Sequence, residues 1–208
     1  MRFCMAPRVF PDIAAAGASN GITPILGSMT NPIRRTASRQ IYEGNLVRLR
    51  EDSVVLPRGT EMIYEYVEIK HGSSTLAMED NGDVWLVREW KYAIGRPSLE
   101  VVSGGIEPGE EAIDAARREL REEAGLTARE WIAMGHVDPF TTMLRCPNYL
   151  FLARGLTRVE RDPEEAEVME VVRLPLQNAV ELVVNGEITH GSSCVAIMKA
   201  AEWMRRRS

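Results

Sequence analysis

The feature of this chain that most constrains its fold is a charged segment in its middle, Gly104–Leu126. The segment contains seven acidic and three basic residues. Its second half is rich in alanine, glutamate, arginine and leucine, which favour helix, so the sequence predicts a helix over Ala112–Ala124. Gly125 follows as the expected left-handed residue that ends the helix. Three residues at helical spacing give the helix an apolar face to pack against a sheet: Ile113, Ala116 and Leu120.

The carboxylates of this helix are harder to explain by structure alone. Glu119, Glu122 and Glu123 lie on about one helical face, where like charges destabilise a helix by roughly 0.3 kcal/mol per pair. They also lie near the C-terminus, where the helix dipole favours cations. A hard divalent cation such as Mg²⁺ would resolve both problems, since it prefers carboxylate and carbonyl oxygens. The alternative is a solvated surface helix in which Arg118 and Arg121 are intrahelical partners.

The rest of the chain indicates a mixed α/β protein in which strands outnumber helices. Residues 40–72 hold several short β-rich runs, and residues 74–92 predict a hairpin that turns at residues 80–83. The further expected strands cover residues 98–103, 131–138, 148–156 and 168–176. The two helices expected at the end of the chain cover residues 176–186 and 192–207.

Composition excludes several classes of protein. The 208 residues carry a formal net charge of −5, which disfavours a nucleic-acid binder. Three scattered cysteines do not form a disulfide framework or a cysteine-based zinc site. No run reaches the roughly 18 apolar residues that a membrane span needs. We therefore expect a soluble, cytoplasmic protein that binds neither nucleic acid nor membrane.

The first 36 residues differ from the rest and are expected to form a flexible tail. They contain four prolines and many small residues, without a clear period. Pro11 and Asp12 interrupt the apolar stretch too early for a secretory signal. Organelle targeting stays open as an alternative.

The spacing of the central segment resembles the Nudix box. The matching positions are Gly104, Glu110, Arg118-Glu119-Leu120, Glu122-Glu123 and Gly125-Leu126. The resemblance implies an α+β fold, a Nudix α/β/α sandwich with a mixed β-sheet and an N-terminal antiparallel strand region. It also implies hydrolysis of a nucleoside diphosphate linked to another group, with Mg²⁺ as the cofactor and Mn²⁺ as a possible substitute. Such cations neutralise phosphate charge and lower the pKa of bound water.

The resemblance assigns roles to particular residues of the box. It makes Glu119 and Glu123 the metal ligands, with Glu122 close by and the backbone carbonyl of Ser103 or Gly104 contributing. Glu110 fills the first acidic position of the box. Arg118 occupies the position that braces the box by pairing with a glutamate.

Residues 41–203 are similar to the branch that hydrolyses ADP-ribose and related nucleoside diphosphate sugars. Such a reaction gives a nucleoside monophosphate and a sugar phosphate. Lys91 stands where that branch has an arginine expected to touch substrate, and Glu100 retains the acid before the box. Phe140 is a candidate to stack on the base or line the sugar pocket, although it is equally suited to a core or a dimer interface. The expected parts are a tail (residues 1–36), an N-terminal strand region (37–72) and a Nudix domain (73–208).

The acidic loop at residues 162–167 matches the loop that supplies a late glutamate in that branch. Glu165 or Glu167 is the candidate, either as the base toward the attacking water or as a further metal ligand. The alternative is that these acids only keep an exposed loop soluble. His136 and His190 have no partner at a suggestive spacing and are expected to be structural.

The resemblance further implies a homodimer in which residues 41–69 form part of the interface. Packing of these strands onto the main sheet of the same chain is the competing interpretation. Two other functions are alternatives: a nucleotide-pool sanitising nucleoside triphosphate pyrophosphatase, and a non-catalytic module that senses a nucleotide sugar. The N-terminal strands count against the first, and the complete set of box glutamates counts against the second.

Overall fold

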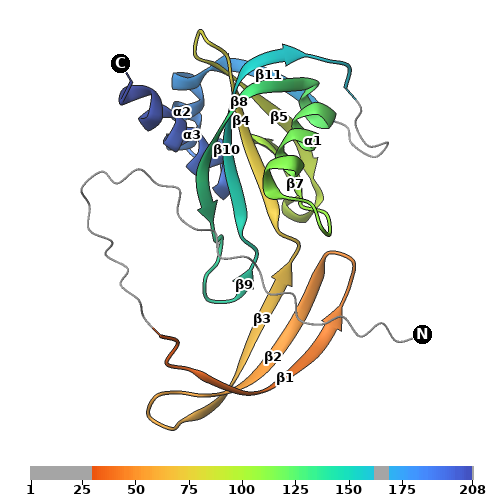
Figure 1. Ribbon diagram of the computed structural model, residues 1–208, viewed down its shortest axis with the longest axis vertical. Coiled ribbons are helices and arrows are strands. Elements are labelled where there is room, and N and C mark those ends of the chain that lie inside the picture. Colours follow the sequence, from red (N-terminus) through yellow and green to blue (C-terminus); the bar gives the residue numbers. More distant parts are fainter. Residues whose placement is uncertain (1–29, 162–168, 208) are drawn as a thin grey trace.

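The computed structural model describes residues 30–161 and 169–207, so Glu165 and Glu167 lie outside the described residues. In chain order, the strands of the two sheets in Figure 1 are β1 (Arg34–Glu43), β2 (Val47–Val55), β3 (Glu61–Ile69), β4 (Gly72–Met78), β5 (Asp83–Lys91), β6 (Arg96–Glu100), β7 (Val102–Gly105), β8 (Leu126–Val137), β9 (Leu144–Arg145), β10 (Asn148–Arg158) and β11 (Met169–Pro175). The helices are α1 (Ala112–Ala124), α2 (Leu176–Val184) and α3 (Gly191–Arg205), with a short 3₁₀ turn η1 (Tyr92–Ile94) after β5.

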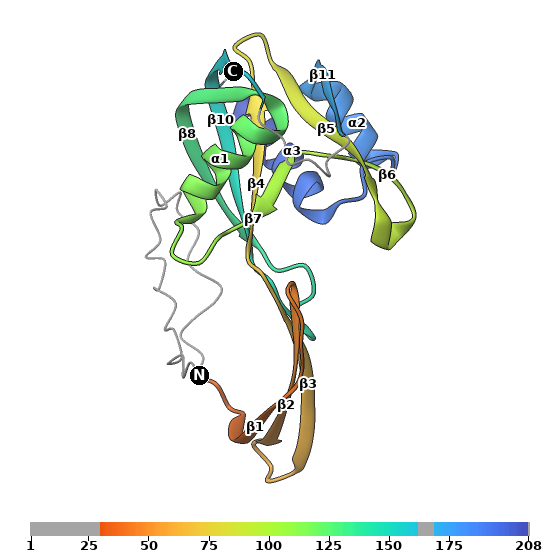
Figure 2. The same cartoon turned by 90° about the vertical axis from the view of Figure 1, so that its right-hand side faces the viewer.

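The main sheet has the strand order β11-β5-β4-β10-β8, with β6 paired to β5 and β7 paired to β4. The β4–β10 pair is parallel and the neighbouring pairs are antiparallel, so the sheet is mixed. Helix α1 covers one face, whereas α2 and α3 cover the other (Figure 2). The predicted α+β class and α/β/α sandwich are therefore confirmed.

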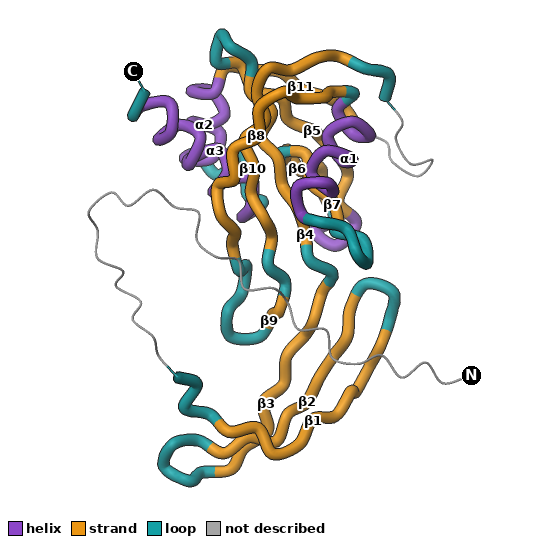
Figure 3. Tube along the Cα trace, viewed as in Figure 1, coloured by secondary structure: helices purple, strands orange, loops and turns teal. Residues whose placement is uncertain are grey.

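The N-terminal strands form a separate sheet, β1-β2-β3-β9, that extends away from the sandwich (Figure 3). It is joined to the main sheet where β3 runs on into β4, and also by β9, whose Leu144 pairs with Val67. All ten residues of β1 are exposed. Neither helix α1 nor α2–α3 covers this sheet (Figure 3).

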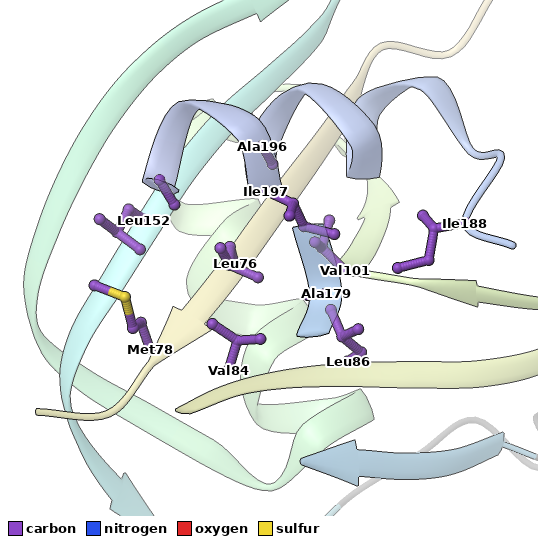
Figure 4. Packing of buried hydrophobic residues seen from close by; sticks show 11 residues of the cluster. Leu76, Met78, Val84, Leu86, Val101, Leu152, Ala179, Ile188, Ala196 and Ile197 are labelled. Carbon is purple, nitrogen blue, oxygen red and sulfur yellow. The ribbon is translucent and has the colours of Figure 1, made fainter. Parts of the chain in front are cut away.

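The core of the sandwich is built on alternating residues of β4. Leu76 and Met78 are fully buried on the face toward α2 and α3, together with Val84, Leu86 and other apolar residues (Figure 4). Ala77, between them, belongs to the cluster on the α1 face. Successive side chains of a strand point to opposite faces, so an apolar run such as Leu76–Met78 suits a strand buried on both sides. No helix of the described ranges is long and apolar enough to cross a bilayer.

One predicted strand, at residues 98–103, proves to be two strands with different partners. The hairpin strands β4 and β5 pair only near their turn, through Ala77–Trp85 and Met78–Val84. Beyond that point β5 pairs with β6, while the free half of β4 pairs with β7. Val101 is the residue at which the chain changes partner. This change carries Ser103 and Gly104 into the middle of the sheet, against β4.

Candidate active site

Helix α1 extends over the predicted residues, Ala112–Ala124. It ends at Gly125, whose left-handed φ of 64° fits the predicted C-terminal glycine. Ala116 and Leu120 are buried against the sheet, which fixes the rotation of the helix. That rotation turns Glu123 inward as well, and only 5% of its surface is exposed.

The carboxylate of Glu123 is held by the main chain of β7. The N–H of Ser103 donates a hydrogen bond of 3.2 Å to Glu123 Oε2. A buried carboxylate needs such partners. Burying an ordinary polar group without a hydrogen bond costs about 1–3 kcal/mol, and burying a charged group without one costs more. This hydrogen bond connects the last turn of helix α1 to strand β7, directly before Gly104.

Gly104 allows a closer contact between the same two elements. A Cβ atom added at Gly104 would lie 1.9 Å from Glu119 Cδ and from Glu119 Oε1. Any side chain at this position would collide with the glutamate. The glycine of the box is therefore required by the approach of Glu119 to the backbone of β7.

Arg118 is the centre of a network of carboxylates. Its guanidinium donates two hydrogen bonds to Glu110, of 3.0 and 3.1 Å, and one of 3.0 Å to the carbonyl of Gly105. It also donates to Glu119 at 2.6 Å and to Glu122 at 3.1 Å. The hydrogen bonds from Arg118 hold the pKa of Glu110 below its ordinary value, with burial opposing them. The Arg118–Glu110 contact is the pairing that the resemblance implied.

The donor set suits a hard cation, although the ligands are not gathered around one point. Carboxylates of α1 and main-chain carbonyls of β7 are the oxygen donors that Mg²⁺ prefers. In the described part of the chain, no three acidic, histidine or cysteine side chains are arranged to hold a metal ion. The positive guanidinium of Arg118 lies between Glu119 and Glu122 instead. The metal assignment stays a prediction, supported by donor chemistry and by the close approach at Gly104.

Lys91 and Glu100 lie in the same region as Glu123. Lys91, at the end of β5, pairs with Glu89. Burial is the largest single effect on the pKa of Lys91 and lowers it, but the hydrogen bond with Glu89 and the neighbouring negative charges together outweigh burial, so the pKa is raised. The charges of Glu100 and Glu123 act in the same direction as Glu89. The structure thus brings two of the three predicted substrate contacts next to the box.

Phe140, the third predicted substrate contact, lies elsewhere, on the turn between β8 and β9, and is 61% exposed. This turn contacts the N-terminal sheet, because the hydroxyl of Tyr64 donates to the carbonyl of Thr142. A hollow of about 490 Å³ is lined by residues of both the turn and the sheet. Two of these residues, Arg145 and Tyr66, stack on each other through the guanidinium and the ring.

Sequence reasoning missed the surroundings of Glu100. This carboxylate is 8% exposed and lies 3.2 Å from Nδ1 of His190, at the start of α3. The same nitrogen lies 2.8 Å from the hydroxyl of Ser193. Burial lowers the pKa of His190, while the charge of Glu100 opposes this effect. No local pattern could have revealed the contact between Glu100 and His190, because these residues lie about ninety positions apart in the chain.

The fold and this site, a loop–helix–loop of carboxylates on a mixed sheet, are those of a hydrolase of phosphoanhydride bonds. The sequence model of the NUDIX domain matches residues 70–191, and that of the nucleoside diphosphate sugar hydrolase N-terminal domain matches residues 33–67. The chain belongs to the Nudix family and is a Nudix pyrophosphohydrolase.

Several known proteins resemble the chain over most of its length. An ADP-ribose pyrophosphatase of Bacillus subtilis is 30% identical over 169 residues, which cover 77% of this chain and 88% of the relative. An ADP-ribose pyrophosphatase of Mycobacterium tuberculosis is 31% identical over 166 residues, covering 78% and 80% respectively. The crystal structure of an ADP compounds hydrolase has the same fold, with a TM-score of 0.76 at 18% identity, and covers 88% of this chain and 99% of that one.

Proposed function

We propose that this enzyme hydrolyses the pyrophosphate bond of a nucleoside diphosphate sugar such as ADP-ribose, giving a nucleoside monophosphate and a sugar phosphate. The observation that carries the proposal is the contact of the box glutamates with β7, through Gly104–Glu119 and Ser103–Glu123. The N-terminal domain match and the two bacterial relatives support the nucleotide-sugar substrate. The same match counts against a nucleotide-pool sanitising enzyme.

Mg²⁺, or Mn²⁺ in its place, is the proposed cofactor. Glu119 and Glu123 would hold the ion, with Glu122 nearby and the carbonyl of Ser103 or Gly104 as a further ligand. When bound, the ion supplies charge neutralisation at the pyrophosphate and an activated water. Arg118 keeps the loop folded against the helix through Glu110 and the Gly105 carbonyl.

Each proposed substrate contact offers a different kind of interaction. The ammonium of Lys91 stays positive beside Glu89 and can attract the negative diphosphate. Glu100 is an acceptor for sugar or base groups, and Phe140 offers an exposed ring for stacking. Glu165 or Glu167 is the proposed base, and both lie outside the described residues. A loop glutamate can serve this role because it can close onto bound substrate.

The enzyme is further proposed to act as a homodimer in the cytoplasm. The exposure of all ten residues of β1 supports the dimer, since a small sheet with such an exposed strand is marginal alone. Cys146 and Cys194 are free thiols, which supports a reducing compartment. That the enzyme binds neither nucleic acid nor membrane stays a prediction.

A substrate panel tests the proposed reaction. The full-length protein is incubated with Mg²⁺ or Mn²⁺ and ADP-ribose, ADP-glucose, GDP-mannose, NADH, diadenosine polyphosphates or 8-oxo-dGTP, and products are separated by ion-exchange chromatography. We expect ADP-ribose or another nucleotide sugar to give the highest kcat/KM, with a nucleoside monophosphate as product. Preferential cleavage of 8-oxo-dGTP would support the sanitising enzyme instead, and tight nucleotide-sugar binding without turnover would support a sensing module.

A further inference from the structure

A second buried polar network lies behind β6 and β7, on the side of α3. The hydroxyl oxygen of Ser193, which is fully buried, accepts a 2.9 Å hydrogen bond from the N–H of Val101. Ser193 Oγ contacts His190 Nδ1 at 2.8 Å, and this nitrogen lies 3.2 Å from Glu100 Oε2. The network joins the first turn of α3 to the strands that lead into the box.

Val101 needs this partner because of its place in the fold. It is fully buried and lies between β6 and β7, where the chain leaves β5 and begins to pair with β4. A buried N–H without a partner costs about 1–3 kcal/mol. Ser193 supplies the partner at the point where the ladder of strand hydrogen bonds is interrupted.

The proton on His190 can be assigned from the geometry of its neighbours. A carboxylate oxygen accepts hydrogen bonds, so we assign the proton to Nδ1, the nitrogen that lies 3.2 Å from Glu100 Oε2. Nδ1–H then donates to Ser193 Oγ at 2.8 Å, and Glu100 Oε2 lies 3.2 Å from the same nitrogen. His190 thus orients both the carboxylate of Glu100 and the hydroxyl that holds Val101.

The strand beyond Val101 is held from both sides of the sheet. Ser193 of α3 binds the N–H of Val101, and Glu123 of α1 binds the N–H of Ser103, two residues later. The segment between these two hydrogen bonds leads directly into Gly104. A shift at Val101 therefore changes where the Ser103 and Gly104 carbonyls stand relative to Glu119 and Glu123.

We propose that His190 is a positioning residue, which acts with Ser193 through Val101 and Glu100 to place the main chain of Ser103–Gly104 for binding the catalytic cation. This inference rests on the proposed function, because it assumes that the cation binds between β7 and the box glutamates. His190 itself is not a metal ligand in this proposal.

The test compares His190→Leu with His190→Asn. An asparagine amide can place its nitrogen near the position of Nδ1 and donate to Glu100, whereas leucine cannot donate. We expect His190→Leu to weaken Mn²⁺ binding and to lower kcat, each by about tenfold, because groups that orient metal ligands have effects of that size. His190→Asn should restore most of both. Binding is measured without substrate, from the electron paramagnetic resonance signal of free Mn²⁺ at a temperature well below each melting point.

Two serine variants test the same proposal if the leucine substitution disturbs folding. Ser193→Ala removes one hydroxyl and should also weaken Mn²⁺ binding, whereas the neighbouring buried Ser192 is the matched control and its alanine variant should bind normally. Normal Mn²⁺ affinity in both His190→Leu and Ser193→Ala would overturn the inference. Equal impairment in the leucine and asparagine variants would also overturn it.

Glu123→Gln separates this inference from the proposed function. If Glu123→Gln loses Mn²⁺ binding while His190→Leu and Ser193→Ala do not, only the role of His190 fails. If Glu123→Gln binds Mn²⁺ as the wild type does, the assigned metal site fails, and the role of His190 fails with it.

Discussion

Glu119 and Glu123 hold the carboxylates that the proposed cation requires, and each sits against the backbone of β7. We expect Glu119→Gln or Glu123→Gln to remove most of the turnover while the protein stays folded. Glutamine keeps the size and helix propensity of glutamate but lacks the charge that holds a cation. Loss of like-charge repulsion also offsets part of the cost to the helix.

Turnover at saturating Mg²⁺ and circular dichroism of the same samples provide the measurement. Glu111→Gln is the matched control, because Glu111 is an exposed glutamate that precedes α1 and makes no capping hydrogen bond through its side chain. Near wild-type turnover in Glu119→Gln and Glu123→Gln would contradict the metal assignment.

Glu110 and Arg118 predict a pH dependence of stability. Arg118 lowers the pKa of Glu110 in the folded protein below the ordinary 4.5. The folded state therefore holds the proton less tightly than the unfolded state, so the pair stabilises the fold above pH 4.5 and loses this effect as the pH falls through the lowered pKa. We expect Glu110→Gln to cost about 1–2 kcal/mol at neutral pH, with a smaller difference in acid.

Urea denaturation of both proteins between about pH 3 and about pH 7 measures this difference. A gap in the free energy of unfolding that stays constant over the whole range would show that the ion pair does not contribute. Glu111→Gln again serves as the control, and no pH-dependent gap is expected for it.

At the scale of elements, the contact between α1 and β7 depends on Gly104. We expect Gly104→Ala to lose most activity and to lower the melting temperature, because its Cβ would overlap the end of the Glu119 side chain and force this carboxylate away from β7. Gly191→Ala is the control, since a Cβ at the start of α3 meets open space. Kinetics and thermal unfolding of both variants test the idea, and equal behaviour of the two would refute the close contact.

The elements that could be predicted from sequence are those with local signals. Helix α1 was predicted residue for residue because its composition favours helix throughout and Gly125 marks its end. The hairpin of β4 and β5 was likewise marked by its turn. The box positions followed from spacing within one helix and its flanking loops.

The parts that sequence could not give depend on which distant segment lies alongside. The division into β6 and β7 follows from a change of neighbouring strand, and nothing around Val101 signals it. The predicted structural role for His190 omitted its contact with Glu100, which only the packing of α3 creates. Periodicity describes one element at a time, so it cannot report such pairings.

At the scale of the whole molecule, the N-terminal sheet is the part that lacks a core. Its exposed apolar side chains include Ile41, Tyr42, Leu46, Met62 and Ile63. A sheet with such residues exposed is suited to pair with another chain. A two-fold axis would bring the same sheet of a second copy against it.

We therefore expect a homodimer that Ile63→Glu dissociates, because a charge would be buried in the interface. Val184→Glu, on the exposed face of α2, is the control and should remain dimeric. Sedimentation equilibrium at micromolar concentration distinguishes a dimer from a species of about 23 kDa. A fully active wild-type monomer would exclude the proposed dimer. Loss of association and turnover together on deletion to Lys70 would support it.

The order of strands in the main sheet also determines when this sheet can be completed during synthesis of the chain. Strands β1, β2 and β3 pair with sequence neighbours, so their sheet can form as soon as they leave the ribosome. Strand β4 must wait for β10, which is made only after α1 and β8, and Val101 must wait for Ser193 of α3. Until β10 is made, a nascent chain therefore presents the N-terminal sheet beside a central strand with one unpaired edge, and such an edge favours aggregation.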